Sequence, residues 1–130
     1  MEVLLTVAIV LIMGTFAFAF MARFFLNNAV ANTADQIAEQ LHKAQVYSMS
    51  GKQDTNWGVK YSSGKITLYS TSNPAFDESF SIDSNVTITG FSPVTFVKAT
   101  GIPSSPLTII VSGNNSSQTV TLDSQGVVKR

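Results

Sequence analysis

A long apolar run near the N-terminus constrains this chain more than any other feature of its sequence. Residues 3–22 read VLLTVAIVLIMGTFAFAFMA and contain no charged side chain. At about 1.5 Å of rise per residue, such a run forms about 30 Å of helix, which matches the apolar core of a bilayer. A helix that is apolar on all sides needs lipid or other helices around it. We therefore predict a transmembrane or filament-core helix over residues 1–26.

The composition of the remaining chain indicates a second part with different surroundings. The 130 residues suffice for one domain with a real core, and Ser, Thr, Asn and Gly crowd the sequence after the apolar run. Eight basic residues balance eight acidic ones, so we expect no general affinity for nucleic acid. The chain has no cysteine, which excludes a disulfide, a thiolate metal site and a cysteine nucleophile.

Residues 27–50 change from an all-round apolar pattern to an amphipathic one. Apolar side chains recur there at helical spacing, at Val30, Ile37, Leu41, Ala44 and Tyr47. No proline separates this stripe from the apolar run, and Gly51 is a plausible cap. We predict one helix from Glu2 to about Met49, about 70 Å long. Its second half packs on the rest of the chain.

Residues 51–130 have the alternating pattern of β-strands. Trp57, Val59 and Tyr61 alternate with Gly58 and Lys60. Turn residues separate further strands, which we predict near residues 66–68, 79–83, 86–91, 94–99, 107–112, 119–123 and 126–129. The fold class is therefore α+β, in which a long N-terminal helix packs on an antiparallel sheet or β-sandwich head.

Two segments resemble a known family. The start of the chain, MEVLLTVAIVLIMG, resembles the N-terminus of type IV pilins and of type II secretion pseudopilins. Residues 41–61, LHKAQVYSMSGKQDTNWGVKY, resemble the junction of helix and first strand in pseudopilins with small β-sandwich heads. The resemblance implies a structural subunit of a type IV pilus that polymerises into an extracellular helical filament through its N-terminal helix. The alternative is a minor pilin or a pseudopilin of a type II secretion or DNA-uptake system.

The resemblance assigns a role to Glu2. In the family, the matching glutamate neutralises the N-terminal amine of a neighbouring subunit, and the match implies that three mature residues, the first of them methylated, precede Met1. A carboxylate carried into hydrocarbon costs about 3 kcal/mol, so a paired ammonium would compensate it and specify the register between subunits. A position in the lipid headgroup region is the alternative for this side chain.

The resemblance also implies which residues pack in the filament core. We expect packing between neighbouring helices at Val3, Leu4, Val7, Leu11, Phe16, Phe18 and Phe20. The helix-breaking proline of the family would fall at Ala19, so Gly14 is the breaker that remains. Any melting of the helix on assembly should begin at Gly14 and Thr15, because glycine costs about 1 kcal/mol in a helix interior.

The implied partners are further copies of the chain, prepilin peptidase and the pilus assembly machinery. The implied location is the cytoplasmic (inner) membrane before assembly and an extracellular filament on the cell surface afterwards. Two other hypotheses remain open. A DNA-uptake receptor would depend on the basic residues Lys129 and Arg130, helped by Lys98. An unrelated surface protein would use the apolar helix only as an anchor.

No catalytic or metal site stands out, so we expect a protein that acts by assembly, without a cofactor, and not an enzyme. Glu39 and His42 have the spacing used in di-iron helices, but other helices would have to supply further ligands. A pair between Glu39 and Lys43 explains the same residues. Three carboxylates of the head lack the spacing of a known calcium loop: Asp77, Glu78 and Asp83.

Overall fold

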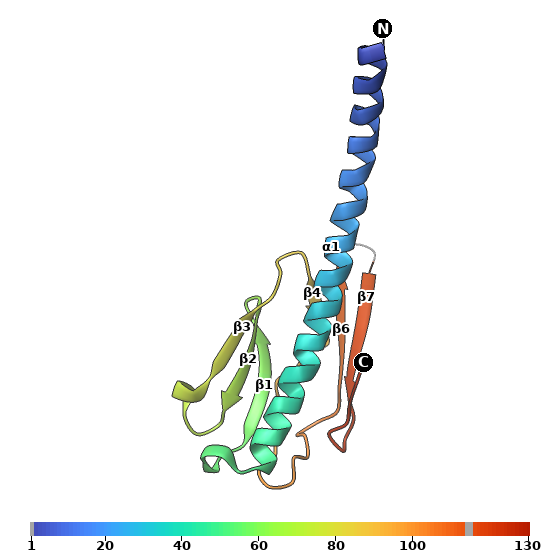
Figure 1. The fold of residues 1–130 in the computed structure, drawn as a ribbon. Helices are drawn as coiled ribbons and strands as arrows, with labels where there is room; N and C mark the ends of the chain where they lie inside the picture. Colours follow the sequence, from blue (N-terminus) through green and yellow to red (C-terminus); the bar gives the residue numbers. More distant parts are fainter. Residues whose placement is uncertain (1, 114–115) are drawn as a thin grey trace.

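The computed structural model describes residues 2–113 and 116–130, and within the helix it describes the side chains of 3–15, 21, 24–25 and 27–49. A single helix, α1, spans Glu2–Met49, which confirms the predicted long N-terminal helix. Its N-terminal half projects beyond the head, whereas its C-terminal half lies along the head (Figure 1).

Helix α1 ends at a glycine turn. Gly51 has a φ of 65°, in the left-handed region that favours glycine, and its backbone N–H donates to the carbonyl of Ser48 at 3.1 Å. A short 3₁₀ helix, η1, follows at Lys52–Asp54 and leads into the first strand. The predicted cap at Gly51 thus turns the chain from the helix towards the sheet.

The head contains two four-stranded antiparallel sheets. The first sheet has the order β3-β2-β1-β5, with β1 at Trp57–Ser62, β2 at Lys65–Ser70, β3 at Glu78–Ser81 and β5 at Val94–Phe96. A 3₁₀ helix, η2, at Pro74–Phe76 connects β2 with β3. In this register the partners of Val59 are Leu68 on one side and Val94 on the other, so buried residues lie beside each other.

The second sheet has the order β4-β6-β7-β8. Its strands are β4 at Thr87–Thr89, β6 at Leu107–Gly113, β7 at Ser116–Leu122 and β8 at Val128–Lys129. The pairing of β7 with β8 places Val128 opposite Leu122, so the C-terminus is held by strand pairing as the sequence predicts.

Three strands are shorter than the sequence pattern predicts because the backbone turns at their ends. Gly90 follows β4 with a φ of 75°, Ala99 lies beyond β5 with a φ of 70°, and Gly126 precedes β8 with a φ of 86°. Left-handed backbone does not continue a strand. The alternating pattern therefore extends past the paired residues at each of these places.

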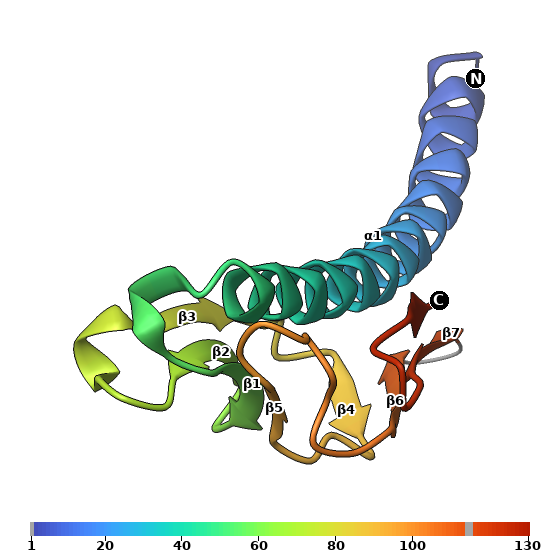
Figure 2. The same ribbon diagram turned by 90° about the horizontal axis from the view of Figure 1, so that it is seen from below.

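The core lies between α1 and the inner faces of both sheets (Figure 2). The predicted stripe on α1 is fully buried at Val30, Ile37, Leu41 and Ala44. Tyr47 differs, because it is only half-buried and packs edge-on against Trp57 with the ring centroids 5.1 Å apart. The second half of α1 is therefore part of the core of the head and fixes the direction of the first half.

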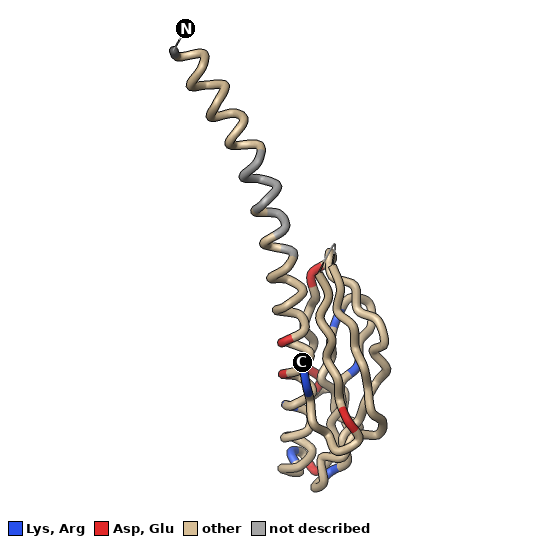
Figure 3. The backbone as a smooth tube through the Cα atoms, turned by 90° about the vertical axis from the view of Figure 1, so that its right-hand side faces the viewer, with Lys and Arg blue, Asp and Glu red and all other residues tan. Residues whose placement is uncertain are grey.

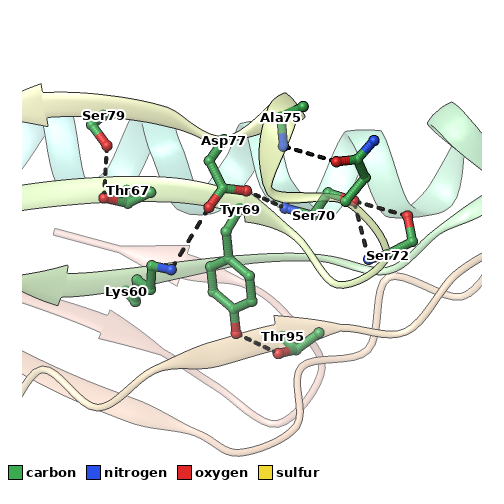
Figure 4. A network of polar contacts seen from close by, with 10 residues as sticks. Lys60, Thr67, Tyr69, Ser70, Ser72, Ala75, Asp77, Ser79 and Thr95 are labelled. Atoms are coloured by element: carbon green, nitrogen blue, oxygen red, sulfur yellow. Dashed lines mark hydrogen bonds and ion pairs between the residues drawn. The ribbon is translucent and has the colours of Figure 1, made fainter.

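The outer face of the first sheet carries a network of polar contacts (Figure 4). The carboxylate of Asp77 accepts a hydrogen bond from the backbone N–H of Ser70 at 3.1 Å and lies 3.7 Å from the ammonium of Lys60. The hydroxyl groups of Tyr69 and Thr95 are hydrogen-bonded at 2.8 Å. These contacts connect β1, β2 and β5 on the side that faces away from α1.

Candidate assembly surface

The first half of α1 exposes large apolar side chains on all sides. Val3 is 75 % exposed and Leu4 is 72 % exposed. The other described members of the predicted filament core, Val7 and Leu11, are also exposed. Covering one such side chain contributes about 1.5–3 kcal/mol. Exposed apolar surface on this scale is typical of a contact site for another molecule.

The structure leaves part of the predicted site untested. The side chains of four predicted site residues lie outside the described part of the chain, and only their backbone is assigned to α1: Glu2, Phe16, Phe18 and Phe20. Their roles stay predictions. Among the residues whose side chains the structure describes, no helix has the length and hydropathy that crossing a membrane requires.

Helix α1 passes through Gly14 and Thr15 without a break. The hydroxyl of Thr15 donates to the carbonyl of Ile12 at 2.8 Å, and the hydroxyl of Thr6 donates to the carbonyl of Val3 at 2.9 Å. Such bonds satisfy a threonine hydroxyl within its own helix. The structure thus shows these residues in a folded helix, and melting on assembly stays a prediction.

Charged residues gather on the head and on the adjoining half of α1 (Figure 3). Asp35 accepts a hydrogen bond from the guanidinium of Arg130, which ties the last residue to the helix. Lys43 lies 2.5 Å from Glu78 of β3, and this hydrogen bond raises the pKa of Lys43. The pairing with Glu39 that the helical spacing favours is therefore replaced by a contact with a strand.

The head carboxylates considered for metal binding are engaged by other groups of the protein. Glu78 is bonded to Lys43, and the carboxylate of Asp83 accepts a hydrogen bond from the backbone N–H of Asn85 at 2.9 Å. His42 is exposed on α1. Within the part of the chain that the structure describes, no three His, Asp or Glu side chains come together as metal ligands.

The basic residues considered for nucleic-acid binding are also mostly paired. Lys98 is bonded to Asp54, and this bond lowers the pKa of the Asp54 carboxyl. Arg130 is bonded to Asp35, while Lys129 lies in β8 with its side chain exposed. Two of these three cations therefore already have a carboxylate partner in their own chain.

Sequence reasoning missed two surfaces that only the tertiary fold creates. One is a polar groove of about 720 Å³ between α1 and the segment after β3, lined by Asn32, Gln36, Glu39 and Asp83 among others. The other is an exposed cluster at the far end of the head, which we name the distal apolar patch. Its members are Val46, Met49, Val97, Ile102 and Val127.

Comparison with known proteins supports the fold. No family model and no curated protein matches the chain. Two solved structures of the minor pseudopilin EpsH from the type II secretion system of Vibrio cholerae are similar to it, each with a TM-score of 0.59. The first is 11 % identical and covers 77 % of this chain and 94 % of its own; the second is 9 % identical and covers 80 % and 94 %. The predicted pilin-like fold is thereby confirmed.

Proposed function

We propose that this chain is a pseudopilin-type structural subunit that assembles into a helical filament of a secretion system and has no catalytic role. One observation carries the proposal. The first half of α1 exposes apolar side chains all round, at positions such as Leu4 and Leu11, and projects from a head of pseudopilin fold. A surface of this kind is suited to a bundle of like helices.

The energetics favour repeated contacts of the apolar half-helices. Five side chains such as Val3, Leu4, Leu5, Val10 and Leu11 offer on the order of 10 kcal/mol on burial, before the entropy of association is subtracted. A contact between different faces of like subunits is open-ended and therefore propagates as a helix. Glu2 would specify the register by neutralising the N-terminal amine of a neighbouring subunit.

The same apolar surface needs a covering before assembly. We place the first half of α1 in the cytoplasmic membrane at that stage, with prepilin peptidase and the assembly machinery as partners. Transfer from lipid to a helix bundle keeps these side chains away from water throughout. After assembly the loops of the head would face the outside of the filament.

The likeness to a minor pseudopilin favours the secretion filament over the shaft of a type IV pilus. Electron cryomicroscopy of filaments sheared from the source cells, combined with mass spectrometry of their subunits, tests this choice. We expect filaments in which several copies of this chain lie beside other subunits of the secretion system. A filament composed mainly of this chain would instead support the pilus shaft, and a chain confined to membranes would contradict both.

A charged variant tests the assembly surface itself. Leu11→Arg places a charge where we expect an apolar bundle, at a cost of about 3 kcal/mol, so incorporation into filaments should fall more than ten-fold. The melting temperature of the head should stay unchanged, because Leu11 is 65 % exposed. Ile110→Arg on the exposed side of β6 is the matched control and should incorporate normally. Normal incorporation of Leu11→Arg would overturn the proposal.

A further inference from the structure

The distal apolar patch unites three segments that are far apart in sequence. Val46 and Met49 come from the end of α1, Val97 and Ile102 flank the loop after β5, and Val127 lies in the turn before β8. Each of these five side chains is between 47 % and 57 % exposed. Most of the other exposed large apolar side chains that the structure describes lie on the first half of α1, at the opposite end of the molecule.

Close contacts between the three segments hold the patch together. A Cβ atom at Gly101 would lie 2.5 Å from Cγ of Met49, and one at Gly126 would lie 3.0 Å from the carbonyl oxygen of Gly101. The backbone N–H of Val97 donates to the carbonyl of Ile102 at 2.9 Å. The three segments are therefore packed against each other, and the patch is preorganised for binding.

The patch continues one face of α1. Exposed side chains on that face are polar at Asn32, Glu39 and His42, and then become apolar at Val46 and Met49 with helical spacing. The face thus has an apolar first half, a polar middle and an apolar end. A polar band between two apolar regions indicates that the end of the helix makes an apolar contact of its own.

The apolar N-terminal segment of the same chain cannot cover the patch. Val10 and Met49 belong to one continuous helix and are separated by about 39 residues, or roughly 58 Å. Any apolar helix that covers Met49 must therefore come from another molecule.

The area of the patch limits what that molecule can be. Five half-exposed side chains offer on the order of 400 Å², about half of what one partner contributes to a standard protein interface. A separate globular protein would bind such a patch weakly. A second copy of the chain already held in the same helix bundle needs only a secondary contact, because the bundle contributes the rest of the affinity.

The N-terminal segment of a second copy has the complementary surface. Thr6, Val7, Val10 and Leu11 border a shallow apolar hollow on α1. A hollow of this kind accepts a side chain from a facing helix, and the unbranched side chain of methionine adapts well to such a site.

We propose that the distal apolar patch binds the exposed N-terminal segment, residues 3–13, of α1 in a second copy of the chain. The inference deepens the proposed function and depends on it, since both need copies with parallel helices. The two copies are displaced along the filament axis by about 58 Å. Because patch and segment are different surfaces, the contact repeats without closing.

Cysteine cross-linking tests the contact, since the native chain has no cysteine. Two differently tagged full-length chains, one with Met49→Cys and one with Val10→Cys, are co-expressed in the source cells and treated with a short bis-maleimide. We expect a cross-linked dimer that carries both tags. His42→Cys in the polar band is the matched control, and its yield with Val10→Cys should be at least ten-fold lower.

Two further measurements separate this inference from the proposed function. Cross-links between two Val10→Cys copies report helix bundling alone. If these cross-links form but Val10→Cys does not cross-link to Met49→Cys, the inference fails and the proposed function stands. If no pair cross-links, both fail. Ile102→Ser should lower the yield with Met49→Cys several-fold without changing the melting temperature, because Ile102 is 47 % exposed. An unchanged yield, or a cross-link from Met49→Cys to a different protein, would overturn the second copy as occupant.

Discussion

Gln45 lies between two glycine turns at the end of the head. Its side-chain amide donates to the carbonyl of Gly101 at 3.2 Å. A Cβ atom at Gly126 would lie 2.3 Å from the same amide nitrogen, and Gly126 has a φ of 86°. Both the backbone conformation and the close contact therefore require glycine at position 126.

Gly126→Ala should lower the free energy of unfolding by about 2–3 kcal/mol. Left-handed backbone costs a non-glycine residue about 1–2 kcal/mol, and displacement of Gln45 removes a hydrogen bond that contributes about 1 kcal/mol. Urea denaturation followed by the fluorescence of Trp57, the single tryptophan, measures the change. Gly64→Ala is the control, since Gly64 has a φ of 72° and no atom within 4 Å of its Cβ position. Equal losses in the two variants would contradict the role of the contact.

Asp123 organises the turn between β7 and β8. Its carboxylate accepts hydrogen bonds from the backbone N–H groups of Val127 at 2.9 Å and Gln125 at 2.8 Å. The bond from Val127 is the main cause that lowers the pKa of Asp123 below its ordinary value of 3.8. The ionised form is therefore the one that the folded state favours.

This pKa shift predicts a pH dependence of stability. A carboxyl group whose pKa is lower in the folded state stabilises the fold above pH 3.8, and this contribution is lost as the pH falls through the lower folded value. Asp123→Asn should thus be less stable than the native chain at pH 7, and the difference should shrink below pH 3.8. Urea denaturation of both chains over a pH series measures it. A difference that persists undiminished in acid would show that the charge of Asp123 does not contribute.

At the scale of the elements, sequence periodicity predicted where α1 begins and ends, but it did not predict which residues α1 contacts. The bounds of the helix follow from the uninterrupted pattern between Glu2 and Gly51. The partner of Lys43 does not, because Glu78 is 35 residues away in β3 and only the packing of helix on sheet brings them together. The distal apolar patch was missed for the same reason, since neighbours such as Met49 and Gly101 come from separate elements.

Ser48 fixes the position of α1 on the head. It is fully buried, its hydroxyl oxygen accepts a hydrogen bond from the backbone N–H of Trp57 at 2.9 Å, and its carbonyl accepts one from the N–H of Ala99 at 3.0 Å. Helix, first strand and the loop after β5 therefore meet at one residue.

Ser48→Ala should lower the free energy of unfolding by about 1–3 kcal/mol, because it leaves the N–H of Trp57 buried without its acceptor. Hydrogen exchange of the Trp57 amide should accelerate in parallel, and thermal denaturation gives the change in stability. Ser50→Ala, at an exposed residue whose hydroxyl donates to the carbonyl of Tyr47 in α1, should change stability by less than about 0.5 kcal/mol. Unchanged exchange at Trp57 would rule out the proposed anchoring.

At the scale of the whole molecule, the first half of α1 forms the proposed assembly surface and the second half forms part of the core. The buried cluster begins at Val30, whereas the described large apolar side chains from Val3 to Phe25 are exposed. A substitution in the first half should therefore affect association, and one in the buried stripe should affect folding.

Removal of residues 1–27 tests this division directly. The shortened chain keeps every member of the core, and Asn28 at its new start is a residue type that caps helices well. We expect it to be monomeric, with a free energy of unfolding within about 1 kcal/mol of the full chain, because the lost side chains are exposed in the monomer. Circular dichroism in urea measures the free energy of unfolding, and light scattering after gel filtration in mild detergent measures the oligomeric state. Loss of cooperative unfolding would mean that the first half of α1 supports the head, while oligomers of the shortened chain would place the assembly surface on the head instead.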